Sequence, residues 1–237
     1  MPDVRMINVL SIDLAHRTWK VEQRADLSAY LGGIGLATKL FAERWRRGSA
    51  PGDPEQPVVL AIGPLSTVFP LVTKTAAVFH SPLTGEWGES YAGMRLAMAL
   101  RFAGYDALVI TGRAPQPVYV TVTPDGAAFR DARGLWGLST EDSGRLLREW
   151  EPGRGHRSTV RIGPAGERGV AFAGVNVDTF RHFGRLGLGA VFGAKNLKAL
   201  VVHGNRSFPI PDRKAYREVY DEIYARAVET DLMEKYH

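Results

Sequence analysis

One segment of this chain occurs twice, and this repeat is the feature that most limits the folds it can adopt. The triplet IGP at 62–64 returns at 162–164. Each copy is followed by a glycine-rich entry, a run of small residues and a β-branched stretch closed by glycine, at 92–112 (AGMRLAMALRFAGYDALVITG) and 184–204 (GRLGLGAVFGAKNLKALVVHG). Self-similarity in a fixed order predicts an internal duplication. The spacer between the IGP triplet and the following segment differs by 8 residues between the two copies, which fits an insertion in a surface loop. The competing explanation is that helix–turn–strand units bounded by glycine are common.

The rest of the pattern favours an α+β fold with mostly antiparallel sheets and a few helices, because strands outnumber helices and do not alternate strictly with them. The expected strands are 4–14, 19–23, 58–62, 74–80, 107–112, 117–123, 127–131, 158–164, 170–178 and 199–204. The expected helices are 27–31, 35–46, 92–103, 140–150 and 184–195. Ser139 and Asp142 form a capping box before 140–150, and Asp26 is the expected cap of 27–31.

The last part of the chain is different in character. Residues 1–208 form the expected main domain, and 209–237 hold a proline linker followed by an amphipathic helix over 213–235. Its apolar stripe comprises Tyr216, Val219, Tyr220, Ile223, Tyr224, Ala227, Val228 and Leu232. We expect this stripe not to pack fully within the chain, so that it needs a partner surface.

Composition excludes several classes of protein. The chain of 237 residues has no cysteine, so it cannot supply disulfides, thiolate metal ligands or iron–sulfur ligands. It has no long apolar run and no signal-peptide pattern, which predicts a cytoplasmic protein that does not enter a membrane. The net charge is +5. Its arginines are spread along the chain without a basic helix or zinc finger, so an anionic ligand explains them better than nucleic acid does.

The main candidate binding cluster is the run RHFGRLG at 181–187. Arg181 and Arg185 flank Gly184 at a predicted helix start, where exposed N–H groups and guanidinium forks bind phosphate well. The corresponding place in the first copy holds Tyr91 and Gly93. Solvated arginines beside a glycine turn are the alternative interpretation. Glu86, Glu89 and Asp178 have no orienting partner in the sequence, so no catalytic residue is assigned.

Longer motifs resemble the N-terminal domain of the tungsten-containing aldehyde:ferredoxin oxidoreductases. They are IGP, KTxxVxxSPLTG, FAGYDAL, DARGLWG, RIGPAGE and GAKNLKAL, in unbroken order over about 4–210. The resemblance implies an α+β domain with an internal duplication, whose sheets form the base for a tungsten, or molybdenum, bis-pterin cofactor. It also implies oxidation of an aldehyde to a carboxylic acid, with electrons passed to ferredoxin.

The resemblance also implies cofactor contacts at particular positions. Arg181, Gly184 and Arg185 match an Arg-Ala-Ala-Gly-Arg stretch of the family, and His182 stands at its first alanine. The arginine pair is then expected to bind pterin phosphates, with a bridging Mg²⁺. Gly93 matches a glycine of the family.

Three positions depart from the family pattern. Lys74 replaces an arginine and loses the bidentate fork, Tyr91 replaces an asparagine, and Ile34 replaces an arginine between glycines. Complete enzymes of the family continue through helical domains that carry a [4Fe–4S] cluster. We therefore expect a partner chain or missing region to supply that part. The alternative is a non-catalytic module that binds a pterin, a nucleotide or a protein.

Overall fold

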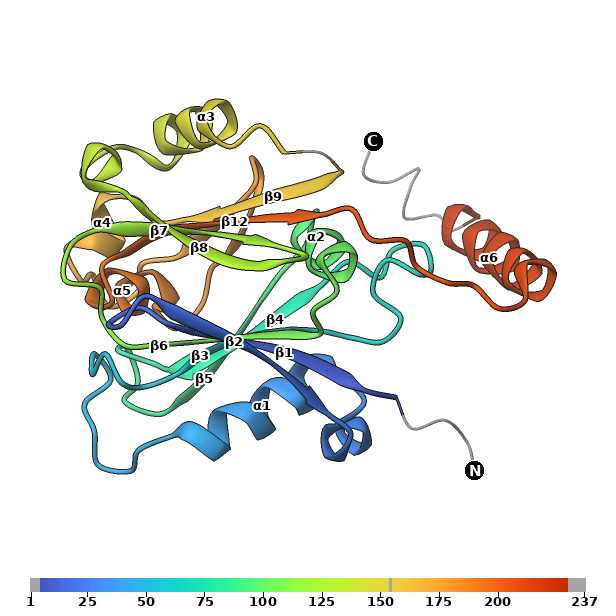
Figure 1. Ribbon diagram of the computed structural model, residues 1–237, viewed down its shortest axis with the longest axis horizontal. Coiled ribbons are helices and arrows are strands. Elements are labelled where there is room, and N and C mark those ends of the chain that lie inside the picture. Colours follow the sequence, from blue (N-terminus) through green and yellow to red (C-terminus); the bar gives the residue numbers. More distant parts are fainter. Residues whose placement is uncertain (1–4, 154, 230–237) are drawn as a thin grey trace.

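In the computed structural model, which describes residues 5–153 and 155–229, two six-stranded sheets lie face to face (Figure 1). The first sheet contains β1 (Ile7–Asp13), β2 (Thr18–Arg24), β3 (Val58–Ile62), β4 (Thr75–His80), β5 (Trp87–Ala92) and β6 (Ala107–Thr111). The second contains β7 (Val118–Thr123), β8 (Gly126–Asp131), β9 (His156–Arg161), β10 (Val175–Val177), β11 (Arg181–Phe183) and β12 (Leu197–Gly204). The helices are α1 (Gly33–Arg44), α2 (Leu96–Ala103), α3 (Thr140–Trp150), α4 (Pro164–Glu167), α5 (Leu188–Ala194) and α6 (Arg213–Val228).

The two sheets have the same topology. The first has the order β2-β1-β6-β3-β4-β5, and the second, taken from its other edge, has β8-β7-β12-β9-β10-β11. In each sheet one pair is parallel, β1 with β6 and β7 with β12, and the other pairs are antiparallel. The α+β class and the internal duplication are therefore confirmed. The repeated unit is larger than the sequence repeat, because it begins with β1 and β7.

The eight-residue difference between the copies is not a simple loop insertion. β4 and β5 have six residues each, whereas β10 and β11 have three each, and the turn between them is shorter. The first copy thus has a longer hairpin. As a consequence, strand β5 forms at 87–92, where the sequence predicted no strand, and helix α2, expected from residue 92, begins only at Leu96. The expected strand 170–178 shrinks to β10.

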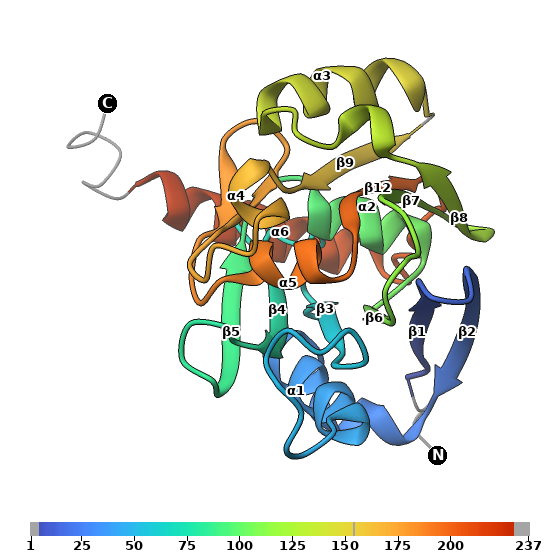
Figure 2. The same cartoon turned by 90° about the vertical axis from the view of Figure 1, so that its left-hand side faces the viewer.

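The helices lie in three layers around the sheets (Figure 2). α1 covers the outer face of the first sheet and α3 covers that of the second, while α2 and α5 lie between the sheets. α2, which belongs to the first repeat, packs on β12 and β9 of the second. The main core is therefore shared by both repeats, with apolar side chains such as Leu60, Leu100 and Leu200 fully buried in it.

Of the two side-chain caps predicted from the sequence, one forms and the other does not. The Ser139 Oγ accepts a hydrogen bond from the Asp142 N–H at 3.0 Å, which confirms the predicted cap of α3. Asp26 does not act as a cap, because its carboxylate pairs with Arg24. The segment Asp26–Tyr30 forms a short 3₁₀ helix that starts without a side-chain cap.

The two repeats approach each other closely at Gly204. A Cβ at this position would lie 2.4 Å from the Ala103 nitrogen and 2.4 Å from the Ala99 oxygen, both in the α2 backbone. Gly204 does not have a left-handed φ, so the constraint is steric and not conformational. Only glycine lets α2 approach β12 this closely.

We therefore predict that Gly204→Ala lowers the free energy of unfolding by about 1–3 kcal/mol, the usual cost of overpacking a core. Gly134→Ala is the matched control, since a Cβ there meets no heavy atom within 4 Å. Urea unfolding followed by circular dichroism measures both. Equal midpoints for the two variants would show that α2 can move away without cost.

A buried lysine joins the second repeat to a loop of the first. Lys195, at the end of α5, is fully buried, and its Nζ donates hydrogen bonds to the carbonyls of Pro54 and, at 2.8 Å, Gln56. Burial lowers the pKa of Lys195 to about 7, against the opposing attraction of carboxylates that include Glu55. The amine is thus held by backbone carbonyls without an ion pair among the described residues.

This burial makes stability depend on pH. Above about pH 7 the folded state has released the Lys195 proton, whereas the unfolded chain holds it up to the ordinary pKa of 10.5. The unfolded state binds more protons in this window, so stability rises with pH by up to about 1.4 kcal/mol per unit. We predict that Lys195→Met reduces this slope between about pH 7 and 9, while the exposed control Lys214→Met keeps it. Identical slopes for wild type and Lys195→Met in pH-dependent urea unfolding would contradict the assignment.

Helix α6 lies at one end of the molecule and is weakly attached to it (Figure 1). Asp212 caps it, and within the described range 213–228 no residue is buried. Tyr216 makes its anchoring contact, through a hydroxyl that donates to the Val68 carbonyl at 2.5 Å and a ring 5.6 Å from that of Phe69. Val219 and Tyr224 are 44% and 53% exposed. The expectation that the stripe stays partly unpacked is confirmed for this range, while 230–237, including Leu232, lie outside the described residues.

Among the helices of the described ranges, none combines the length and apolarity needed to cross a membrane.

Candidate functional site

The edges of the two sheets meet where the sequence places its candidate residues. β5 at the edge of the first sheet contacts β11 at the edge of the second. Ser90 accepts a hydrogen bond at 3.4 Å from the Arg185 backbone N–H, and Ser81 donates one at 2.8 Å to the Leu186 carbonyl. The segment after β11 is therefore fixed against the first repeat, although it is about 95 residues away in sequence.

The arginine cluster is not at a helix start, contrary to the sequence prediction. Arg181 and His182 lie in β11, where His182 pairs with Asn176 of β10, and α5 begins only at Leu188. The backbone groups that a helix would need are used in strand pairing. Gly187, with φ 81°, lies in the turn between β11 and α5. Arg181, His182, Gly184 and Arg185 are all exposed.

Lys74 and Tyr91 come together in a cavity of about 360 Å³. Tyr91 lies opposite Ala76 in the β4–β5 ladder, so its side chain is on the same sheet face as Lys74, two residues before Ala76. The alternation of exposed and buried residues along β5 leaves Tyr91 42% exposed. Its hydroxyl donates to Glu89 at 3.0 Å, and partial burial together with Glu89 raises the pKa of Tyr91.

Two glycine segments of the sequence also line this cavity. Gly33 and Ile34 lie in the first turn of α1, and Gly63 follows β3. No side chain caps α1, so its first N–H groups are free to bind an anion. Ile34, where the family pattern has arginine, contributes an apolar surface instead of a charge. The sequence pattern does not predict that this glycine segment lies beside Lys74.

The predicted residues thus fall into two adjoining groups. Lys74 and Tyr91 line the cavity, while Arg181 and Arg185 lie on β11 and the following loop, outside its lining. Gly93 is buried between Tyr91 and α2, with Thr73 as its neighbour. Ser90, adjacent to Tyr91, accepts a hydrogen bond from the Arg185 N–H, so both groups lie at the same edge strand, although Ser90 and Tyr91 point to opposite faces of the sheet. We refer to the residues of the two groups together as the cofactor face.

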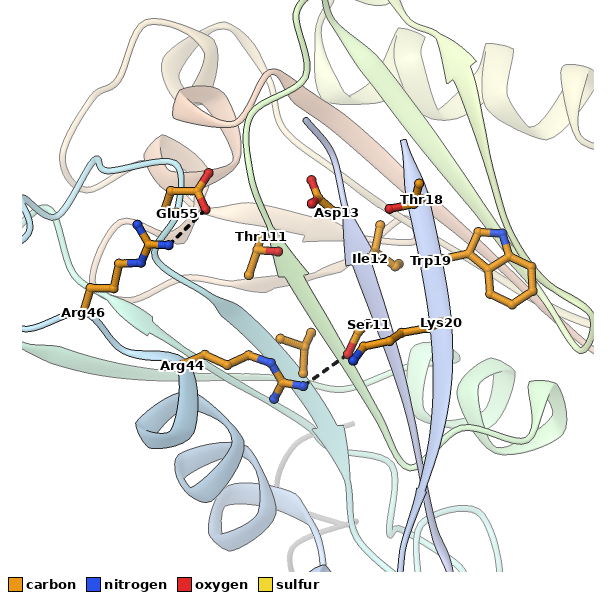
Figure 3. A pocket seen from close by; sticks show the side chains of 11 residues that line it. Ser11, Ile12, Asp13, Thr18, Trp19, Lys20, Arg44, Arg46, Glu55 and Thr111 are labelled. Carbon is orange, nitrogen blue, oxygen red and sulfur yellow. Dashed lines mark hydrogen bonds and ion pairs between the residues drawn. The ribbon is translucent and has the colours of Figure 1, made fainter. Parts of the chain in front are cut away.

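A separate cavity of about 450 Å³ lies between β1, β2 and the C-terminal end of α1 (Figure 3). Its charged side chains have ion-pair partners. Arg44 binds Ser11 and, at 3.2 Å, Glu22, and Arg46 lies 3.8 Å from Glu55. Lys20 also pairs with Glu22, and Asp13 pairs with His16. No binding residue predicted from the sequence lines this cavity.

Comparison with known proteins agrees with the fold and the motifs. The sequence model of the family "Aldehyde ferredoxin oxidoreductase, N-terminal domain" matches residues 9–204. The chain is 36% identical over 216 residues to the tungsten-containing aldehyde ferredoxin oxidoreductase of Pyrococcus furiosus, covering 90% of this chain and 36% of that protein. It is 33% identical over 231 residues to a WOR-like subunit of an aliphatic sulfonate oxidoreductase of the same organism, with 90% and 35% covered.

A solved structure shares the architecture as well. The active-site complex BamBC of benzoyl coenzyme A reductase, in complex with 1,5-dienoyl-CoA, superposes with a TM-score of 0.86 at 28% identity. The match covers 92% of this chain and 34% of that one. Fold, motifs and relatives together define a domain of the kind found in these oxidoreductases.

The chain belongs to the aldehyde ferredoxin oxidoreductase family and corresponds to its N-terminal domain. It spans about a third of the length of the curated relatives it matches. Those relatives carry the names of different oxidoreductases, so the family alone does not define a substrate.

Proposed function

We propose that this chain is the cofactor-holding part of an aldehyde:ferredoxin oxidoreductase-type enzyme in the cytoplasm. The complete enzyme would oxidise aldehydes to carboxylic acids at a tungsten, or molybdenum, bis-pterin centre. The observation that supports the proposal is that both groups of the cofactor face lie at the neighbouring edges of the two duplicated sheets, Lys74 and Tyr91 in a cavity beside β5 and the arginines on β11 and the following loop.

The residues of this face fit an anionic ring-bearing cofactor. Arg181 and Arg185 are exposed guanidiniums on a backbone segment that Ser90 fixes, which suits pterin phosphates with a bridging Mg²⁺. Lys74 and the Tyr91 ring adjoin the free N–H groups of α1 and offer hydrogen bonds and stacking to a heterocycle. Gly93, His182 and Gly184 complete the set proposed to contact the cofactor.

The cofactor would supply the redox chemistry, and this chain would supply position and electrostatics. Its own residues bind and orient the anionic groups and shield one face from water. None is proposed as catalytic, because the carboxylates near the face already have partners. Glu89 accepts the Tyr91 hydroxyl, and Asp178 accepts hydrogen bonds that hold a loop.

A second chain, or a continuation of this one, would complete the enzyme. The sequence has no cysteine, so a [4Fe–4S] cluster and the contact with a ferredoxin-like acceptor belong outside it. The division into a domain at 1–208 and a helical start at 209–237 is proposed on the same basis. α6, with its exposed apolar residues, lies where such a region would attach.

The second candidate function is a module that binds a pterin, a nucleotide or a protein without redox chemistry. It is favoured by one observation, that Ile34 brings an apolar side chain to the cavity where the family pattern has a cation. An adjacent gene that encodes a cysteine cluster would favour the split enzyme.

For the arginine pair, we predict that Arg181→Ala with Arg185→Ala reduces cofactor retention in the assembled enzyme by at least about 100-fold. Each charge-assisted hydrogen bond to phosphate contributes about 1.5–3 kcal/mol, so two lost contacts suffice. Thermal stability should barely change, since both side chains are exposed. Tungsten or molybdenum by mass spectrometry and pterin by fluorescence measure retention. The control is Arg47→Ala with Arg113→Ala, exposed arginines away from the face. Equal cofactor content in both double variants would refute the assignment.

For α6, we predict that Val219→Ser with Tyr224→Ser weakens association with the cluster-bearing partner while changing the stability of this chain by less than about 1 kcal/mol. Both side chains are about half exposed here, so they contribute little internal packing. Size-exclusion chromatography of the mixed chains measures association. The control, Lys214→Ser with Glu218→Ser, changes only charged side chains of the same helix. A partner that binds both variants as it binds wild type would exclude α6 from the interface.

A further inference from the structure

A second basic site lies beside the cofactor face and does not share its residues. It is a cavity of about 160 Å³ between the two repeats. The residues that line it come from the start of α2, the end of α3, β9 and the loop after β10; those used below are Met94, Arg95, Arg148, Arg157, Asp178 and Phe180. Three arginines and one aspartate are therefore among the residues that line one small space.

The carboxylate does not neutralise the arginines. Asp178 accepts hydrogen bonds from the Ser158 hydroxyl and the Thr159 N–H, both at 3.0 Å, and from the Arg95 backbone N–H at 3.2 Å. In the described residues it forms no ion pair. Its role is to fix the loop after β10 to β9 and to the beginning of α2, which holds the cavity walls in place.

The arginines differ in how they are held. One nitrogen of Arg157 donates to the carbonyls of Arg148 at 3.2 Å and Glu151 at 2.6 Å, so this side chain is anchored at the end of α3. The side chains of Arg95 and Arg148 are exposed and have no hydrogen-bond or ion-pair partner within the described ranges. Burial, together with the charge of Arg148, lowers the pKa of the neighbouring Arg161. Positive charge thus exceeds negative charge at this cavity, which has three arginines and one aspartate, Asp178, in its lining.

We propose that this cavity binds a phosphate group, either free or carried as an ester on a ring-bearing molecule. Three forked guanidiniums suit a phosphate dianion as ligand better than they suit a ligand with a single carboxylate. The volume admits one such group. Phe180 lies at the cavity and is 77% exposed, so its ring is free to stack on the apolar part of an ester.

This site is independent of the proposed pterin function, because it uses neither the arginine pair at 181 and 185 nor Lys74. It can therefore be tested on the 237-residue chain alone, without metal, pterin or partner. The test is isothermal titration calorimetry at constant ionic strength, with inorganic phosphate, phenyl phosphate and acetate as probes. Inorganic phosphate and phenyl phosphate separate a free anion from an ester, and acetate tests the class of anion.

We expect saturable binding of one phosphate per chain, weakened at least tenfold by Arg95→Gln with Arg148→Gln. Both side chains are exposed, so melting temperatures should match wild type, and Arg157 is left intact because it anchors α3. Phenyl phosphate should bind about three- to tenfold more tightly than phosphate, and Phe180→Ala should remove that difference. Acetate should bind weakly or not at all.

The matched control is Arg47→Gln with Arg113→Gln, exposed arginines outside both proposed sites, which should bind phosphate as wild type does. Unchanged phosphate affinity in the Arg95 and Arg148 variant would overturn the proposal. Loss of phosphate binding in Arg181→Ala with Arg185→Ala, while the Arg95 and Arg148 variant binds as wild type does, would assign the anion to the cofactor face and overturn the proposal. Acetate binding as tight as phosphate would overturn the proposed ligand class. None of these results would decide whether the assembled enzyme holds a pterin, so the two proposals fail separately.

Discussion

Packing of α2 and α5 in the space between the two sheets is the interaction on which the other features of this domain depend. Each sheet has an apolar inner face, and each repeat supplies one helix to cover it. α2 crosses to the sheet of the other repeat, where its backbone lies against Gly204. Neither repeat keeps this core when taken alone, so the duplicated halves form one cooperative unit.

This arrangement also determines where ligands can bind. The edge strands β5 and β11 are brought together because the helices between the sheets set the spacing of the two halves. The cofactor face therefore contains residues from both repeats, joined through Ser90 and the Arg185 N–H. The arginine-lined cavity is also built from both, with Asp178 joining β9 to the start of α2. Sites between two halves of a fold are common places for ligands.

Local signals in the sequence predicted much of this fold. The repeat, the β-branched strands and the Ser139 cap depend on residues close together in the chain, and the structure agrees with them. β5 and β11 were missed because glycine, serine and short length hide their strand character, and pairing with distant partners decides it. The role of Lys195 was also hidden, since its hydrogen bonds reach carbonyls about 140 residues earlier. Family resemblance gave the candidate positions, whereas only the structure showed that Lys74 and Tyr91 share a cavity.

The central claim is that this duplicated domain is the base for a metal–pterin cofactor completed by another polypeptide region. Its most direct test is the metal and pterin content of the wild-type chain purified under anaerobic conditions with its native partner. The account predicts tungsten or molybdenum in near-stoichiometric amount with organic pterin, both absent from the isolated chain. A stoichiometric complex that contains neither metal nor pterin would contradict it.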